Sequence, residues 1–285
     1  MHDIFFFTDI HGMYDLYRAI MDYCDEQDPE AMIIFGGDAC DRGRQGYKIM
    51  KELLDNPRVV YLRGNHEEIF CNAAREIKEK FEIVDMERKE MRSILYTTLT
   101  FDNRFLAIQH SLNNGGMNTL LDWIDDGMPM DIIERLERLP FTFSTDMCDF
   151  CHAAGVYQTF ERASEAEYEG EKVDSRDAEA LVWCRSAFNI GWKSGRTAVF
   201  GHTPVISMNY YMPVPEGIVQ PLKWVGKLFP DNNGPKINMD TGAVFTGIAY
   251  VLNVLTMQAQ GFEDTDYTEN EIRKHDVKKI DCVQM

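Results

Sequence analysis

Residue types that commonly bind metal ions follow five short apolar runs of the chain. The runs DIFFF, AMIIFGG, RVVYLR, DFC and TAVF lead into TDIHG, DACDRG, GNHEE, HAAG and GHTP. A single histidine at a strand end is more often a hydrogen-bonding or surface residue than a ligand. Four of the seven histidines fall at such places, however, and this joint placement favours one shared site. The side chains concerned are Asp9, His11, Asp38, Asn65, His66, His152 and His202.

These side chains offer carboxylate and amide oxygens and imidazole nitrogens, without a thiolate. Such a donor set suits manganese, iron, zinc or cobalt better than calcium. Two divalent ions about 3.5–4 Å apart that share one carboxylate form a site for in-line displacement at phosphorus, because they activate a shared water and neutralise the phosphoryl oxygens. Asp38 is the natural bridging carboxylate, since it leaves the central predicted strand between the other ligand groups.

Alternating strands and helices must position the first of these residues. Helical patterns at 12–27, 46–56 and 67–83 follow the first three apolar runs. This order predicts a βαβαβ unit with parallel strands and right-handed crossovers. Functional sites gather at the carboxyl ends of such strands, which is where the candidate ligands stand.

The remainder of the chain predicts other elements around this unit. Residues from about 85 to 140 have helical patterns, and 139–154 reads as two strands around a turn at Asp146. Residues 236–262 read as a run of strands, expected to be antiparallel, whereas the Pro- and Gly-rich segment 210–235 is expected to be loop. The polar tail, about 264–285, has little to bury. We therefore expect a single domain over 1–285 with a helical insertion at about 85–140.

Composition excludes several classes of function. The chain has 285 residues, 45% of them hydrophobic, which excludes general disorder. A formal charge of −18 argues against a nucleic-acid partner, because binding to that backbone needs basic surface. The apolar runs are too short for a signal peptide or a membrane span, so we expect no membrane partner and a cytoplasmic location. Seven irregularly spaced cysteines predict reduced thiols, and CDFC at 148–151 lacks the second CxxC of a zinc site.

The motifs DIHG, GDACDRG, RGNHE, CHAAG and FGHT resemble those of the metal-dependent phosphoprotein phosphatases, which are calcineurin-like metallophosphoesterases. The resemblance is closest to the bacterial and bacteriophage lambda branch and covers about residues 3–250. NGGMNTL, LVWCRSAF and INMDTGAVFTG are looser matches to the same branch. The resemblance implies an α/β fold (α+β in some schemes), namely a metallophosphoesterase β-sandwich flanked by helices, with the helical insertion over the active site.

The resemblance also implies a role for each motif residue. Two divalent ions are expected, manganese first, with iron, zinc, cobalt or nickel as alternatives. Asp38 would bridge them, His66 would be the general acid, and Asp41 would orient the His66 ring. For Arg185, whose motif is short, a surface ion pair is the alternative. The expected metal ligands are Asp9, His11, Asp38, Asn65, His152 and His202, and the expected phosphate-binding residues are Arg42, Arg63 and Arg185.

Three functions compete at this point. The first is a phosphomonoesterase, above all a protein serine/threonine phosphatase with phosphotyrosine as an alternative substrate. It would use a metal-bridging hydroxide and act on phosphorylated proteins or small phosphoesters. The second is a symmetrical dinucleoside tetraphosphate hydrolase, which needs base-stacking residues in the insertion, where Trp123 and Phe101 are the candidates. The third is a non-catalytic metal-binding scaffold, against which the Asp41–His66 pair and the full ligand set argue.

Cys40 is expected to be a buried filler, with redox modulation as the alternative.

Overall fold

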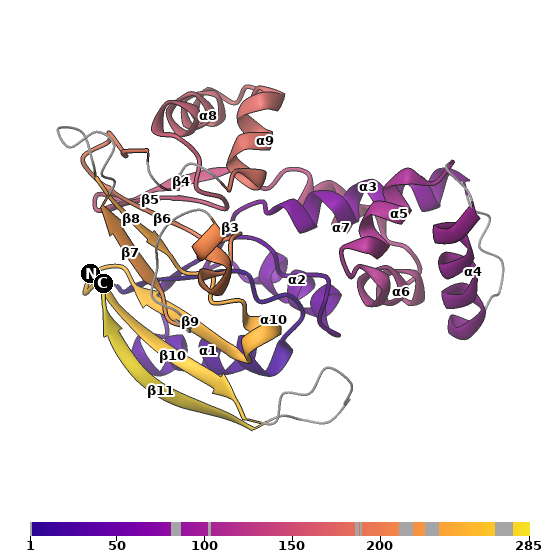
Figure 1. The fold of residues 1–285 in the computed structure, drawn as a ribbon, viewed down its shortest axis with the longest axis horizontal. Coiled ribbons are helices and arrows are strands. Elements are labelled where there is room, and N and C mark those ends of the chain that lie inside the picture. The colour runs from indigo at the N-terminus through magenta and orange to yellow at the C-terminus, as the bar shows by residue number, and fades with distance from the viewer. Residues whose placement is uncertain are drawn as a thin grey trace.

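Two mixed β-sheets pack face to face, and helices cover the outer faces (Figure 1). This computed structural model describes residues 2–80, 87–101, 104–185, 188, 190–210, 219–225, 234–265 and 276–285. The expected α/β sandwich flanked by helices is confirmed. Among the described residues, no helix combines the length and apolar character needed to cross a bilayer.

The first sheet has six strands and contains the expected βαβαβ unit. Helices α1 (Tyr14–Gln27) and α2 (Gly46–Asp55) connect three strands that pair in parallel. The other three strands pair antiparallel, as expected for the two of them that lie within 236–262. In spatial order the strands are β11 (Val277–Gln284), β10 (Gln258–Asp264), β9 (Ile248–Asn253), β1 (Ile4–Phe7), β2 (Met32–Phe35) and β3 (Val59–Tyr61).

The apolar run of β1 serves two cores at once. Phe5 and Phe7 lie in the core that α1 and α2 cover, whereas Phe6 lies in the core between the sheets. Successive side chains of a strand point to opposite faces, so an unbroken apolar run is required where both faces are buried. Phe6 stacks on Phe150 of the other sheet with ring centroids 5.3 Å apart, which joins the two sheets directly.

The second sheet corrects two expectations about the second half of the chain. Residues 222–225 form a strand within the segment expected to be loop, because the flanking prolines lie outside LKWV or at the start of the next strand. The strand at 235–238 pairs in parallel with residues 198–200, so the run from 236 onward is not wholly antiparallel. The strands in spatial order are β4 (Thr142–Ser144), β5 (Cys148–Cys151), β6 (Thr197–Phe200), β8 (Pro235–Asn238) and β7 (Leu222–Val225).

A helical arm projects from one side of the sandwich (Figure 1). The helical patterns expected between about 85 and 140 are present, with one additional helix, α5, around His110. Outside the arm, α8 (Tyr157–Glu169) and α9 (Ser175–Trp183) pack on the second sheet and were not predicted. The arm consists of α3 (Asn65–Lys80), α4 (Arg88–Phe101), α5 (Leu106–Asn113), α6 (Met117–Asp125) and α7 (Met130–Leu136).

The polar end of the chain forms an edge strand. β11 pairs antiparallel with β10, although most of its side chains are half-buried or exposed. The tail was expected to bury little, and its exposed side chains agree with this. The strand itself was not expected. Backbone hydrogen bonds need no apolar side chain, so an edge strand can be polar.

The cysteine pair of CDFC lies on opposite faces of its strand. Cys148 packs between the sheets, and Cys151 packs in the core under α8 and α9. Burial raises the pKa of both thiols to about 12. A disulfide or a shared metal would need the two sulfurs on one face. Cys148 and Cys151 are therefore core residues of two different layers. Cys40 is also buried, and burial raises the pKa of its thiol, as expected of a filler.

Candidate dinuclear metal centre

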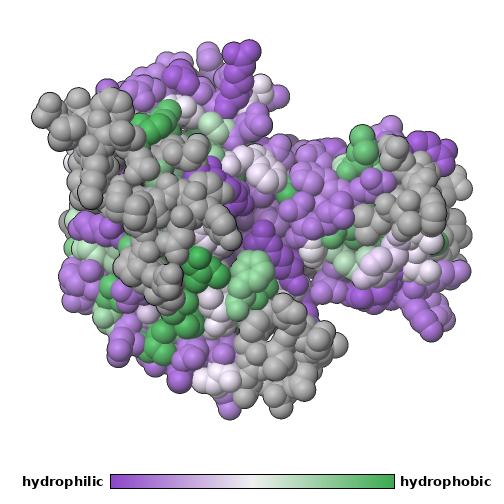
Figure 2. All heavy atoms as spheres, in the orientation of Figure 1, coloured by the Kyte–Doolittle hydropathy of each residue, from purple (hydrophilic) through white to green (hydrophobic). Residues whose placement is uncertain are grey.

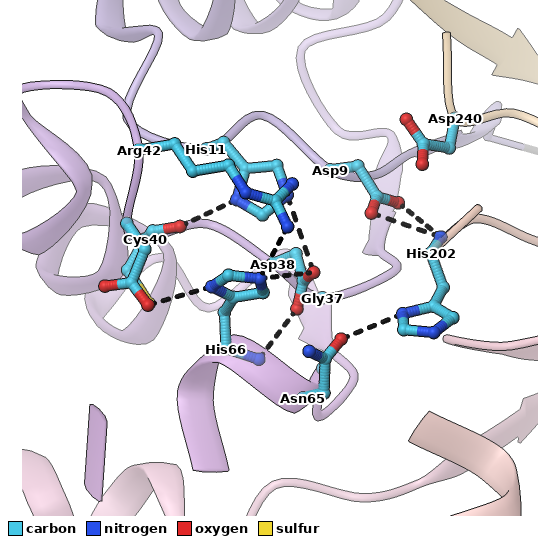
Figure 3. A network of polar contacts seen from close by, with 12 residues as sticks. Asp9, His11, Gly37, Asp38, Cys40, Arg42, Asn65, His66, His202 and Asp240 are labelled. Carbon is cyan, nitrogen blue, oxygen red and sulfur yellow. Dashed lines mark hydrogen bonds and ion pairs between the residues drawn. The ribbon is translucent and has the colours of Figure 1, made fainter. Parts of the chain in front are cut away.

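The carboxyl ends of five strands from both sheets meet at one place. Asp9 follows β1, Asp38 follows β2, and Asn65 begins α3 just after β3. His152 follows β5 and His202 follows β6. Each of these five side chains is at most 4% exposed. Residues up to 193 positions apart in the sequence are thereby brought into hydrogen-bond contact (Figure 3).

The Asp38 carboxylate lies between two groups of histidines. Its Oδ2 is 3.5 Å from His11 Nε2, and its Oδ1 is 3.4 Å from His152 Nε2. Two sets of potential ligand atoms therefore share Asp38: one with His11 and His66, the other with His152 and His202. One carboxylate shared by two sets of donors is the arrangement that a pair of divalent ions requires.

Asn65 completes the second group of donors. Its Oδ1 lies 3.0 Å from His152 Nε2 and 2.9 Å from His202 Nδ1. Asp9 lies at the edge of the cluster, where its two oxygens accept the backbone N–H of His202 at 3.1 and 3.0 Å. Asp9 is thus near the centre, but its carboxylate belongs to neither of the two tight sets.

Backbone carbonyls fix the tautomer of two of these histidines. His11 Nδ1–H donates to Cys40 O at 2.8 Å, and His152 Nδ1–H donates to Gly36 O at 2.8 Å. In each ring Nε2 is then left as the atom that can bind a metal ion, and in each ring Nε2 faces Asp38. Histidine ligands of metals are commonly oriented by such bonds on the other ring nitrogen. The residues present therefore fit divalent cations.

The backbone around the cluster has unusual conformations. Left-handed φ values between 44° and 67° occur at Asp9, His11, Asp38, Asp41, Arg42 and His202. In the described chain, only Met128 and Met257 share this property among non-glycine residues. Such conformations are costly for L-residues and cluster at functional sites. Glycines complete the fit: a Cβ on Gly64 would collide with the Asp38 side chain, and one on Gly201 would collide with Asp9.

Asp41, His66 and Arg42 form a chain of contacts beside the cluster. Figure 3 shows Arg42 beside His66. His66 Nδ1 lies 2.8 Å from Asp41 Oδ2. The Arg42 guanidinium contacts His66 Nε2 at 2.9 Å and His11 Nε2 at 2.6 Å. Burial by itself would lower the pKa of His66, but Asp38 and Asp41 outweigh it and raise that pKa. In this structure His66 Nε2 accepts from Arg42, and a histidine whose Nδ1–H is held by a carboxylate can take up and deliver a proton at Nε2 once that contact is released.

Carboxylates crowd the centre and shift its titration. Burial raises the pKa of Asp9 to about 6 and that of Asp240 well above its ordinary value. Burial opposes ionisation of Asp38 too, but His152 and His66 hold its pKa well below its usual range. For His152, Asp38 outweighs the effect of burial and raises the pKa to about 10. Buried negative charge of this kind is what a divalent cation neutralises.

The helical arm holds the loop that carries Asp41 and Arg42. Arg42 N–H donates to Gly115 O at 2.9 Å, and Asp41 N–H donates to Thr119 Oγ1 at 3.0 Å. Gly115 and Thr119 belong to the α5–α6 connection and the start of α6. The arm therefore flanks the Asp41–Arg42 side of the centre.

The other two predicted arginines have different surroundings. Arg185 Nη1 donates to His202 O at 2.9 Å and to Thr203 Oγ1 at 3.2 Å, which places its guanidinium at the second donor group. Arg63, in contrast, donates to Glu137 O and lies over the Phe141 ring, 4.6 Å from its centroid. Among the described contacts, none brings the Arg63 guanidinium to the histidine cluster, so its expected phosphate contact stays a prediction.

Sequence reasoning gave no role to two buried carboxylates. Glu67 accepts the backbone N–H groups of Asp38, Ala39 and Gly64 at 2.8–2.9 Å and thereby shapes the loops around the bridge. Its place in RGNHE, directly after His66, was the available signal. Asp240 lies close to Asp9 (Figure 3) and accepts the N–H of Gly242 at 2.8 Å. Its only signal was the loose match INMDTGAVFTG.

A family model described as calcineurin-like phosphoesterase matches residues 2–211. No curated protein matches the chain at a significant level. The chain is similar to a solved structure of a candidate diadenosine tetraphosphatase, at 12% identity and a TM-score of 0.46, over 98% of this chain and 93% of that one. It is also similar to a cold-active protein-tyrosine phosphatase of a Shewanella species, at 16% identity and a TM-score of 0.45, over 92% of this chain and 77% of that one. A protein serine/threonine phosphatase from Saccharomyces cerevisiae is similar at 11% identity and a TM-score of 0.41, over 100% of this chain and 81% of that one.

Proposed function

The chain belongs to the calcineurin-like phosphoesterase family and is a metal-dependent phosphatase, and we propose that it hydrolyses phosphate monoesters, chiefly phosphoserine and phosphothreonine in proteins. The observation that carries this proposal is the position of Asp38, whose two oxygens each face a different histidine group. Such a centre activates water and neutralises phosphate, which is the chemistry of monoester hydrolysis.

The donor atoms suggest how two cations would be held. Bound cations would supply Lewis acidity toward water and the phosphoryl oxygens. Manganese is the metal that we propose first, although iron, zinc, cobalt and nickel also suit nitrogen and oxygen donors. Asp9, His11 and Asp38 would hold one cation, and Asp38, Asn65, His152 and His202 would hold the other.

The protein's own residues would handle the leaving group. Asp41 accepts a hydrogen bond from Nδ1–H of His66. The proton for the ester oxygen would therefore come from Nε2 of the protonated His66 ring. The Arg42 guanidinium, 2.9 Å from that atom, would hold the phosphate where the proton is delivered. A serine alkoxide leaves poorly without a proton, so this pair supports action on alkyl esters. It also argues against a non-catalytic scaffold.

The aromatic residues of the arm bear on the alternative substrate. A dinucleoside tetraphosphate hydrolase needs exposed rings on which bases can stack. Trp123 is fully buried, with its Nε1–H donating to Pro129 O at 3.2 Å, so its ring faces are not free. The side chain of Phe101 lies outside the described residues. The burial of Trp123 therefore removes this ring as a candidate for base stacking.

Two finer predictions accompany this function. The motifs NGGMNTL and LVWCRSAF support membership of the bacterial and bacteriophage lambda branch. The cytoplasmic location also stays a prediction.

The proposed function is tested by comparing three substrates on one chelated and reloaded preparation. After chelation we expect no turnover, because the buried donors of Asp38 and its neighbours then lack their cations. Added manganese should restore hydrolysis of a phosphoserine peptide and of p-nitrophenyl phosphate, measured as released phosphate. Diadenosine tetraphosphate should be hydrolysed far more slowly. Full activity without metal, or preference for the dinucleotide, would overturn the proposal.

Replacement of Arg185 tests the proposed phosphate contact on the second side of the centre. Arg185→Ala should lower kcat/KM for phosphate esters about 10- to 100-fold, since it removes a charged hydrogen-bond donor. Metal content should not change, because among the described contacts Arg185 donates to the backbone oxygen of His202 and to the hydroxyl of Thr203, not to a ligand side chain. Arg162→Ala is the matched control, as Arg162 is exposed and pairs with Asp177, which belongs to neither donor group. If both variants behave like wild type, Arg185 forms no more than a structural contact.

A further inference from the structure

A histidine of the helical arm stacks on a tryptophan beside the second sheet. His110 lies in the last turn of α5, and Trp183 is the last residue of α9. Their ring centroids are 6.1 Å apart, and the planes of the two rings differ by 14°. His110 is exposed and Trp183 is half-buried. The contact therefore joins the arm to the part of the sandwich that α8 and α9 cover.

The two helices that meet in this stack belong to different apolar cores. Ile108 and Leu112 of α5 pack in the core that α1 and α2 cover, whereas Leu181 of α9 packs in the core under α8 and α9. On the face seen in Figure 2, the residues where the arm meets the sandwich are mainly hydrophilic. The described apolar cores therefore hold α5 and α9 separately, and the contact between His110 and Trp183 connects them.

Trp183 lies next to one side of the metal centre. Its ring meets the His202 ring edge to face, with the ring centroids 6.0 Å apart. Arg185 follows two residues later in the chain, and its Nη1 donates to His202 O at 2.9 Å. Because only one residue separates Trp183 from Arg185, a shift of the tryptophan would also displace the arginine.

The same end of α5 holds Arg42 on the other side of the centre. Gly115 O accepts the backbone N–H of Arg42 at 2.9 Å, and Gly115 has a left-handed φ of 87°. A Cβ built on Gly115 would lie 2.9 Å from Arg42 Cα, so this loop packs directly on Arg42. Asn114 Nδ2 donates to His110 O at 2.8 Å and ties the loop to the turn that carries His110. Residues 110–115 thus connect Arg42 to Trp183.

We propose that His110, through its stack on Trp183, is a positioning residue for the phosphate. The stack sets the distance between Arg42 and Arg185, so that both guanidinium groups can bind one phosphate. The inference rests on the proposed function, in which both arginines bind phosphate. Arg42 lies at the first donor group, 2.6 Å from His11 Nε2, and Arg185 lies at the second. A phosphate between the two groups must accept hydrogen bonds from both arginines, and a displacement of about 1 Å is enough to weaken such binding strongly.

Inorganic phosphate is the probe for this proposal, because its binding is measured without turnover. In calorimetric titrations of the manganese-loaded protein, His110→Ala should raise the dissociation constant of phosphate about 3- to 10-fold. The KM for a phosphoserine peptide should rise by a similar factor with less change in kcat, since the arginines also hold the phosphate in the ground state. His110→Phe should restore most of the affinity, because a flat ring can still stack on Trp183. Leu106→Ala is the control, since Leu106 is an exposed residue at the start of the same helix.

A double-variant cycle distinguishes positioning from a general structural role. If His110 acts through Arg185, His110→Ala should have little further effect on phosphate affinity in the Arg185→Ala background. Equal losses in both backgrounds, unchanged affinity in His110→Ala, or loss of a metal ion from this variant would overturn the proposal. If the wild-type protein binds phosphate but hydrolyses no monoester, the proposed function fails, and the phosphate titration still tests the role of His110. If the wild-type protein binds no phosphate, both proposals are wrong.

Discussion

Asp38→Asn is expected to abolish phosphatase activity, with a loss of at least about 10³-fold in kcat. The reason is that Asp38 is the only described carboxylate that faces both histidine groups, so its neutralisation weakens two cation sites at once. Metal content, measured by mass spectrometry after gel filtration, should fall from two ions toward zero. Asp38 Oδ1 accepts the backbone N–H of His66 at 3.0 Å. The asparagine oxygen can still accept this hydrogen bond, so the fold should persist.

Asp149→Asn is the matched control for this experiment. Asp149 is fully buried in β5 and accepts hydrogen bonds from Ser144 and from the Trp192 indole, away from the histidines. We expect this variant to be less stable to heat but to keep both ions. Should Asp38→Asn retain two ions and wild-type turnover, Asp38 would not bridge, and the proposed centre would have to be abandoned.

The first half of the fold could be predicted because its hydrophobic pattern indicates both the type of each element and which of its faces are buried. Apolar runs such as DIFFF are short, and helices with one apolar face follow them, so the βαβαβ unit was evident. The second half is different. β7 and β11 are stabilised by pairing with β8 and β10, and no local pattern specifies these pairings. The polar side chains of β11 also give no period-2 signal. Strand pairing of that kind depends on tertiary context.

The candidate site was predictable to the extent that its residues occur in recognisable motifs. Asp38 and His152 were predicted from their positions at strand ends, and in the structure Asp38 Oδ1 lies 3.4 Å from His152 Nε2. Side-chain direction was not predictable: Arg63 is adjacent to a motif, yet its guanidinium contacts Glu137 and Phe141. Glu67 was overlooked for the same reason, because its role depends on backbone N–H groups almost thirty residues away.

His66→Asn is expected to lower kcat on a phosphoserine peptide about 10²- to 10⁴-fold, the usual contribution of a general acid. On p-nitrophenyl phosphate the loss should be clearly smaller, because p-nitrophenolate leaves without a proton. Both rates should be measured under single-turnover conditions, in which product release does not limit them. Asp41→Asn should show the same dependence on the leaving group more weakly, since Asp41 holds the ring through Nδ1 and delivers no proton itself.

Metal content decides how a loss in His66→Asn is interpreted. His66 lies with His11 and Asp38 in one of the two sets of potential ligand atoms, so geometry alone would also allow it to bind a cation. If His66 is a general acid, the variant should keep both ions. If His66 is a ligand, the variant should lose an ion. His2→Asn is the control, since His2 is exposed, pairs with Asp28 and should affect neither substrate. Two retained ions with equal losses on both substrates would contradict the acid role and assign His66 to holding the phosphate. A lost ion would make His66 a ligand, and the proton would then have to come from another group.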